Sequence, residues 1–305
     1  MIKSSYPSNN TMSKRSLIFT SMGDRPDILS SWIGSNPETN QYDIWVYSYH
    51  NNYPLLVSSG LLDKITFHNV RSDASKFQNL AHAYTHYPTR FQNYDNYLIL
   101  DDDLLLTPSQ IHLWIDLQEK YGLDISQPGF RSGPGLQVSW KCTKAQSAYV
   151  FHYTSFIEMT APMFRAKILH HWIKDFIPYS NMLAGWGTDL FYMLTLDPFK
   201  PQAYAVIDTV TVSNPKRSVA IKGKNRKNRV NSKNGINRIH GMNGLISKKN
   251  RKRQWERVRQ AKGWTDNSYP VLQSGHLAIN SDTCDTPVIY EKPYYHETVN
   301  LHPIT

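Results

Sequence analysis

The chain has 305 residues, of which 40% are hydrophobic and 12% aromatic, and this length allows one large α/β domain or two small ones. Its two cysteines exclude a disulfide framework, and its apolar runs are shorter than the ~20 residues that span a bilayer. Because no apolar run near residue 1 reads as a signal peptide, we expect a soluble protein of a reducing cytoplasm.

The net charge of +10 is concentrated in one segment. Residues 215–262 hold 17 Lys and Arg and a single acid, Glu256, whereas the rest of the chain holds 17 basic and 23 acidic residues, a net charge of −6. A mildly acidic body therefore carries a basic segment. Three kinds of partner suit such a segment: an anionic membrane surface, a polyanionic acceptor such as an acidic polysaccharide, and nucleic acid.

Short apolar runs alternate with amphipathic stretches in the first half of the chain, the pattern of an α/β sheet. In chain order we expect strands at 16–20, 42–47, 64–70, 97–100 and 123–126, followed by a loop at 127–130. Helices are expected from Asp27, over 72–87, and behind Thr107 and Pro108, which read as an N-cap and a first helical residue. The second half predicts helices over 165–176 and 190–194 and a strand over 203–212.

Residues 247–264 predict a basic helix with an apolar stripe, because Trp255, Val258, Ala261 and Trp264 recur every three residues. Such a stripe suits a helix that lies in a bilayer interface, with the two tryptophans as apolar anchors. We therefore expect peripheral binding at the inner face of a membrane. The alternative is that the stripe packs on the domain and the charges are solvated.

An acidic cluster, Asp101-Asp102-Asp103, directly follows the apolar strand at 97–100. Alternate residues of an extended segment point the same way, so Asp101 and Asp103 are expected to converge while Asp102 points elsewhere. Hard oxygen ligands suit Mg²⁺ or Mn²⁺, which bridges a diphosphate and stabilises the charge on a leaving group. The alternative is an acidic cluster that favours the start of the next helix.

A second site is predicted at the loop Gly185-Trp186-Gly187-Thr188-Asp189. Asp189 is our first candidate for a general base, a group that takes a proton from a hydroxyl. Trp186 offers a flat face to a sugar ring, and Gly187 lets the backbone approach a ligand. The alternative is that Thr188 or Asp189 caps the following helix.

Two other polar residues interrupt apolar surroundings. Glu158 lies between Ile157 and Met159, so it is either functional or paired with a basic side chain, and it is our second candidate for the base. His152 is interpreted as a satisfied structural histidine.

Five segments, in this order, resemble the GT-A glycosyltransferases and, more closely, the domain-of-unknown-function family 707, which itself looks GT-A-like. They are YLILDDDL (97–104), GLDISQPGF (122–130), SFIEMTAPMF (155–164), GWGTD (185–189) and VIDTVTVSNP (206–215). The resemblance covers about residues 16 to 215. It implies a Rossmann-like mixed sheet flanked by helices, here with a basic C-terminal extension.

The resemblance also implies an activity: a metal-dependent glycosyltransferase that uses Mn²⁺ or Mg²⁺ to move a sugar from a UDP- or GDP-sugar to a saccharide acceptor in surface polysaccharide synthesis. Asp101 and Asp103 match the metal motif. The family usually carries a His where Asn214 stands, so the third ligand is open, with His240 and His276 as candidates. Residues assigned to the donor are Gly23, Asp24, Arg25, Asp102, Lys216 and Arg217.

The domain organisation follows from the resemblance and the charge pattern. We expect a disordered N-terminus over 1–13 and a catalytic domain over 14–214. That domain divides into a nucleotide-sugar half, 14–130, and an acceptor half, 131–214. The basic segment occupies 215–264, and a tail over 265–305 packs on the domain.

Two other classes of function are open to this sequence. A nucleic-acid-binding protein could use residues 215–262, but the segment has few interleaved aromatics and no zinc, helix-turn-helix or RNP-like pattern, so no nucleic acid is expected. The second class is another metal-dependent nucleotidyl or phosphoryl transferase. A P-loop would favour it, and the sequence has none.

Overall fold

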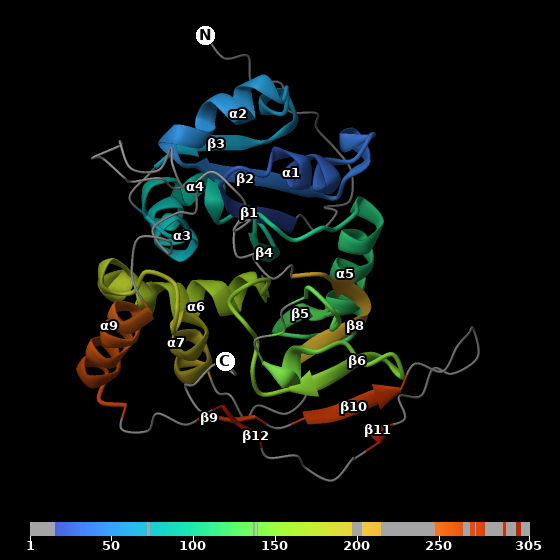
Figure 1. Cartoon of the computed structure of the whole chain (residues 1–305), viewed down its shortest axis with the longest axis vertical. Helices are drawn as coiled ribbons and strands as arrows, with labels where there is room; N and C mark the ends of the chain where they lie inside the picture. The colour runs from blue at the N-terminus through green and yellow to red at the C-terminus, as the bar shows by residue number, and fades with distance from the viewer. Residues whose placement is uncertain are drawn as a thin grey trace, which may run out of the picture.

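A mixed sheet flanked by helices on both faces forms the body of the protein (Figure 1). The computed structural model describes residues 16–71, 74–136, 138, 140–196, 203–214 and 248–264, with only the backbone of His50, Lys248 and Lys249. It also describes the backbone of 269–271, 273–277, 289–290 and 297–299. The fold class is the one expected from the sequence.

The sheet has the strand order β11-β10-β6-β8-β5-β7-β4-β1-β2-β3. Its strands are β1 (Ser16–Met22), β2 (Tyr42–Ser48), β3 (Phe67–Val70), β4 (Asn96–Asp101), β5 (Ile125–Phe130), β6 (Tyr149–Thr154), β7 (Met163–Arg165), β8 (Tyr204–Val212), β10 (Gln273–Leu277) and β11 (Ile289–Tyr290). Strands β1 to β4 pair in parallel, and β7 runs antiparallel between β4 and β5. The carboxyl ends of β1, β2 and β4 therefore meet at one edge, where ligands of open α/β sheets bind.

Helices cover the two faces as separate layers. They are α1 (Pro26–Ile33), α2 (Tyr53–Ser58), α3 (Lys76–His86), α4 (Pro88–Phe91), α5 (Pro108–Lys120), α6 (Ala166–Phe176), α7 (Thr188–Thr195) and α9 (Lys248–Ala261). Figure 1 shows α1 and α5 on one side of the sheet and α3, α4, α6, α7 and α9 on the other. Alternation along β1 explains the two cores, because Leu17 and Phe19 join one and Ile18 joins the other.

The loop predicted at 127–130 is wrong, because β5 runs on through Phe130. Its residues are all buried, and β5 pairs in parallel with β8 from Ile125 to Phe130. Pro128 and Gly129 read as a turn in isolation, but here they accompany a register shift between the two strands. The strand expected over 64–70 also begins later, at Phe67, after a 3₁₀ turn at Leu62–Lys64.

The basic helix α9 packs on the body with Trp255 and Val258 inward, whereas Ala261 of the predicted stripe is exposed. Trp255 is 1% exposed, Val258 is fully buried, and Trp264 packs against the same core. The expectation that both tryptophans anchor the protein in a bilayer is wrong for Trp255, whose ring is covered by protein. Trp264 is only partly buried, and its membrane role stays a prediction. None of the helices in the described ranges has the length and apolar character needed to cross a membrane.

Candidate functional site

The acidic cluster lies at the carboxyl end of β4. The strand ends at Asp101, and Asp102 and Asp103 belong to a turn, so the argument from strand alternation does not reach Asp103. Asp102 points to β1, where its carboxylate accepts the backbone N–H of Gly23 at 2.5 Å. Burial raises the pKa of Asp102 to about 7, and the neighbouring carboxylates add to the rise.

Lys76, on the first turn of α3, neutralises the first of these carboxylates. Its Nζ lies 2.7 Å from Oδ1 of Asp101 and donates to the carbonyl oxygens of Ile99 at 3.1 Å, Met159 at 2.8 Å and Thr160 at 3.1 Å. The Lys76 side chain is 7% exposed, so the ammonium group is held rigidly among these acceptors. Sequence reasoning missed Lys76, and no local signal separates it from a surface lysine that starts a helix.

The donor set fits a divalent cation that is shared with a substrate. The Asp101 side chain is 40% exposed, and only one of its oxygens is committed to Lys76. Mg²⁺ in proteins commonly takes one or two carboxylates and completes its shell with substrate phosphates and water. In the described part of the chain no group of three or more His, Cys, Asp or Glu side chains could hold a metal by itself. The predicted third ligand, His240, lies outside the described residues, as does the side chain of His276.

Asp189 lies at the start of α7 and faces the loop between β6 and β7. Its carboxylate accepts the backbone N–H of Leu190 at 3.0 Å and is also within hydrogen-bonding reach of the Met159 and Gly187 backbone N–H groups. Burial raises its pKa to about 6, although these N–H groups pull the other way. Asp189 thus satisfies backbone donors at the start of α7, and its role as a general base stays a prediction.

The loop between β6 and β7 links Asp189 to the acidic cluster. The backbone N–H of Asp101 donates to the carbonyl of Thr160 at 2.9 Å. Met159, one residue earlier, accepts from Lys76 through its carbonyl and faces Asp189 with its N–H. The strand-end carboxylates and the buried Asp189 therefore lie on either side of a single loop.

Gly187 is covered by α9. It adopts φ +92°, and a Cβ built on it would lie 2.9 Å from the ring of Trp255. Gly187 was predicted to allow close approach of a ligand. Instead, the Trp255 ring fills the space that a side chain at position 187 would occupy. Trp186 is partly buried and packs against the core on this face of the sheet, and its sugar-binding role stays a prediction.

Glu158 is buried at 6% exposure and is bonded to hydroxyl groups. Thr160 donates to its Oε1 at 2.9 Å and Thr143 to its Oε2 at 3.4 Å, while its backbone N–H donates to Gln127 at 2.6 Å. These contacts hold the loop between β6 and β7 in place, and the role of Glu158 as the second candidate base stays a prediction.

His152 is a structural residue, as interpreted from the sequence. It is 1% exposed, with Nδ1 2.8 Å from Asp208 and Nε2 3.0 Å from the carbonyl of Cys142. Burial raises the pKa of Asp208, although His152 opposes the rise. The pair joins β6 to β8, which are separated from β4 and its acidic cluster by β5 and β7.

The three donor-binding candidates in the turn after β1, Gly23, Asp24 and Arg25, differ in their contacts. Gly23 binds Asp102, whereas Asp24 is exposed. Arg25 makes a bidentate contact with Asp27 at 2.9 and 2.7 Å, so its guanidinium already has a carboxylate partner. Burial raises the pKa of Tyr49, which follows β2, and the charges of Asp102 and Asp101 add to the rise. The donor-binding candidates Lys216 and Arg217 lie outside the described residues.

No family model matches the chain, and no curated protein matches it. Solved structures that resemble it include S. aureus TarS 1–349 bound to UDP, with a TM-score of 0.46 and 10% identity over 66% of this chain and 60% of that chain. The same fragment bound to UDP-GlcNAc gives 0.44 and 13% over 70% and 60%, and S. aureus TarS gives 0.43 and 10% over 67% and 37%. The chain thus covers less than two thirds of these proteins. Likeness at this level assigns no activity or ligand, and membership of family 707 stays a prediction.

Proposed function

We propose that the protein is a metal-dependent glycosyltransferase that moves a sugar from a UDP- or GDP-sugar to a saccharide acceptor in surface polysaccharide synthesis. The observation that carries the proposal is the placement of Asp101–Asp103 and Asp189 on either side of the Met159–Thr160 loop. Carboxylates can hold a divalent cation that in turn binds a diphosphate, whereas a base for the acceptor needs one carboxylate of raised pKa. We assign these two roles to the two sides of the loop.

The donor side is assigned to the ends of β1 and β4. Asp101 and Asp103 would hold Mn²⁺ or Mg²⁺, which when bound neutralises the diphosphate leaving group. Lys76 keeps the Asp101 carboxylate oriented by occupying one of its oxygens. Asp102 fixes the β1 turn through the backbone N–H of Gly23, so that turn is positioned to receive the nucleotide.

The acceptor side is assigned to the start of α7. Asp189 takes the proton from the acceptor hydroxyl as that oxygen attacks the anomeric carbon, and the nucleoside diphosphate departs with the bonding electrons. The backbone N–H groups around Asp189 fix the carboxylate in one orientation. Trp186 is the residue proposed to contact the acceptor sugar.

A donor panel tests the proposal. Purified protein is mixed with UDP- and GDP-sugars, with Mn²⁺ or with chelator, and release of the nucleoside diphosphate is measured. We expect metal-dependent release from a subset of donors. Full release in chelator, or hydrolysis of nucleoside triphosphates alone, would contradict the proposal, the second result favouring a nucleotidyl or phosphoryl transferase.

A further inference from the structure

The helix α9 has two chemically different faces. Its inner face carries the buried Trp255 and Val258. Its outer face carries three exposed cations, Lys252, Arg253 and Arg257. Since a helix rises 1.5 Å per residue, these charges are spread over roughly 7.5 Å of helix axis.

The one acidic residue of α9 does not offset these cations. Glu256 forms an ion pair with Arg259 of the same helix, and Nη2 of Arg259 lies 2.9 Å from Oε2 of Glu256. Lys262, just past the helix, is likewise committed to Asp175 of α6 at 2.6 Å. Among the described residues the ion pairs of this region use Arg259 and Lys262, and Lys252, Arg253 and Arg257 are exposed.

The chemistry of the outer face favours one class of polyanion. Trp255 is the only aromatic residue of α9, and its burial leaves no aromatic platform there for the bases of a single-stranded nucleic acid. The same burial removes the apolar face with which an amphipathic helix enters a bilayer. An acidic polysaccharide needs neither feature, because its carboxylate, sulfate or phosphate groups bind spaced cations directly.

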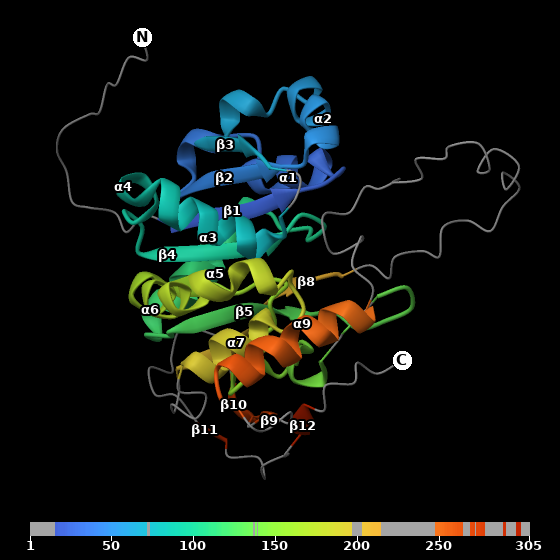
Figure 2. The same ribbon diagram turned by 90° about the vertical axis from the view of Figure 1, so that its left-hand side faces the viewer.

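The position of α9 places such a chain beside the proposed acceptor site. Figure 2 shows α9 crossing in front of α7, and the Trp255 ring lies against Gly187, two residues before Asp189. Since the inner face of α9 covers this loop, the outer face lies about one helix diameter, roughly 10 Å, from it. We propose that the outer face of α9 binds an acidic polysaccharide whose chain extends past the helix to the 185–189 loop as the acceptor. The binding surface stands on the geometry of α9, and only the acceptor role rests on the proposed glycosyl transfer.

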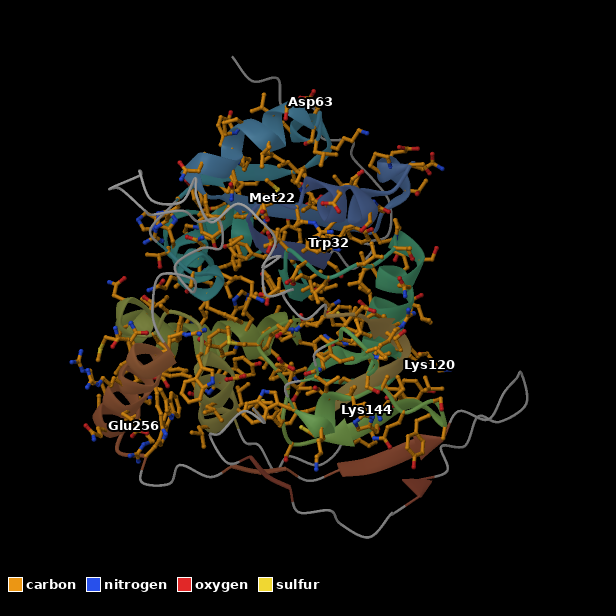
Figure 3. All side chains as sticks on the ribbon, in the orientation of Figure 1. Met22, Trp32, Asp63, Lys120, Lys144 and Glu256 are labelled. Atoms are coloured by element: carbon orange, nitrogen blue, oxygen red, sulfur yellow. The ribbon has the colours of Figure 1, made fainter. Side chains whose placement is uncertain are left out.

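A charge-reversal experiment tests the surface. Binding of fluorescein-labelled heparin, an acidic polysaccharide, is followed by anisotropy for the wild type and for Lys252→Glu/Arg253→Glu/Arg257→Glu. The matched control is Lys64→Glu/Lys120→Glu/Lys144→Glu, which changes the net charge equally at exposed lysines; Lys120 and Lys144 lie far from Glu256 of α9 in Figure 3. We expect the α9 variant to bind at least about tenfold more weakly, with a log–log salt dependence shallower by roughly three, because three contacts are lost.

Other outcomes overturn the proposal. Equal losses in both triple variants would show a response to net charge alone, and unchanged binding in the α9 variant would place the polyanion elsewhere. Tighter wild-type binding to phosphatidylglycerol vesicles or to duplex DNA than to heparin at the same salt concentration would assign the face to a membrane or to nucleic acid. Donor hydrolysis is measured in the same variants. Its absence in the wild type would defeat the glycosyl transfer proposal, whereas heparin binding reports on the surface alone.

Discussion

The Nζ atom of Lys76 lies 2.7 Å from a carboxylate oxygen of Asp101, and the same ammonium group donates to three backbone carbonyls. This contact joins α3 to the end of β4 and to the loop that faces Asp189. Lys76→Met leaves one carboxylate without its cation and removes one donor from each of three carbonyls. We expect it to lower the free energy of unfolding by roughly 2–3 kcal/mol in a urea titration.

The control for Lys76 is Lys167→Met. Lys167 also pairs with an aspartate, Asp124, but at 3.4 Å and with 65% of its side chain exposed. The Asp124 side chain is 4% exposed, but the ammonium group of Lys167 is largely solvated, so we expect a smaller loss than for Lys76→Met. Similar losses for the two lysines would contradict the buried role of Lys76. Lys76→Arg should not restore stability, because a planar guanidinium does not reproduce the compact group that reaches all four acceptors.

The contact between Gly187 and Trp255 predicts a stability effect with two separable parts. Gly187→Ala places a Cβ on a residue whose backbone is left-handed, with φ +92°. That Cβ lies 2.9 Å from the Trp255 ring. Gly60→Ala shares the backbone strain, with φ +67°, but meets nothing within 4 Å. The strain alone costs about 1–2 kcal/mol, so we expect Gly187→Ala to lose more than Gly60→Ala by thermal unfolding.

The double variant identifies the origin of that difference. In a Trp255→Ala background the ring is gone, and the additional effect of Gly187→Ala should fall to that of Gly60→Ala. Trp255→Ala itself should cost about 3–5 kcal/mol, because it empties a fully buried ring site. If the excess loss at Gly187 persists without the ring, the strain has another source.

Local features of this fold could be predicted from the sequence. Thr107 accepts the backbone N–H of Gln110 and Pro108 takes the first helical position, as expected, because a cap depends on residues within one turn. Ile111 and Trp114 face the core for the same reason, since helical spacing alone selects them. The strand that ends at Asp101 was also recognisable, because its apolar run directly precedes the charges.

Contacts between distant elements could not be predicted in this way. From the sequence, Lys76 is an ordinary polar residue at the start of a helix. In the fold, the carbonyls of Met159 and Thr160 in the loop between β6 and β7 accept from its ammonium group and bury it. The stripe of α9 fits a membrane or a protein surface equally well, and the choice depends on whether Gly187 leaves space for Trp255. Pairing with β8 likewise decides that Pro128 and Gly129 belong to a strand.

The metal assignment predicts a defect in binding that leaves folding intact. Asp103→Asn removes a carboxylate from the turn after β4 while keeping its size. We expect Mn²⁺-dependent binding of UDP or GDP, measured by calorimetry, to fall below detection, with the circular dichroism spectrum unchanged. Asp116→Asn, on the exposed face of α5, is the control with the same chemical change. Nucleotide binding that survives in Asp103→Asn, or that ignores chelator, would move the donor site away from β4.

The raised pKa of Asp189 predicts how turnover depends on pH. The base must be ionised to take a proton, so turnover should fall about tenfold per pH unit below the pKa of about 6. Asp189→Asn should lower turnover by roughly 10²–10⁴ with the donor affinity unchanged, because the carboxylate acts only as the acceptor attacks. Initial rates between pH 5 and pH 8 measure both effects, with Glu158→Gln expected to keep the same acidic limb.

The same carboxylate links activity to stability. Its pKa is higher in the folded state than the ordinary 3.8, so folding is most favoured by this group below pH 3.8 and least favoured above about pH 6. The difference corresponds to roughly 3 kcal/mol against folding at pH 7. We therefore expect Asp189→Asn to weaken the decline in stability between pH 4 and pH 6. An unchanged decline, together with full turnover, would transfer the role of base to Glu158.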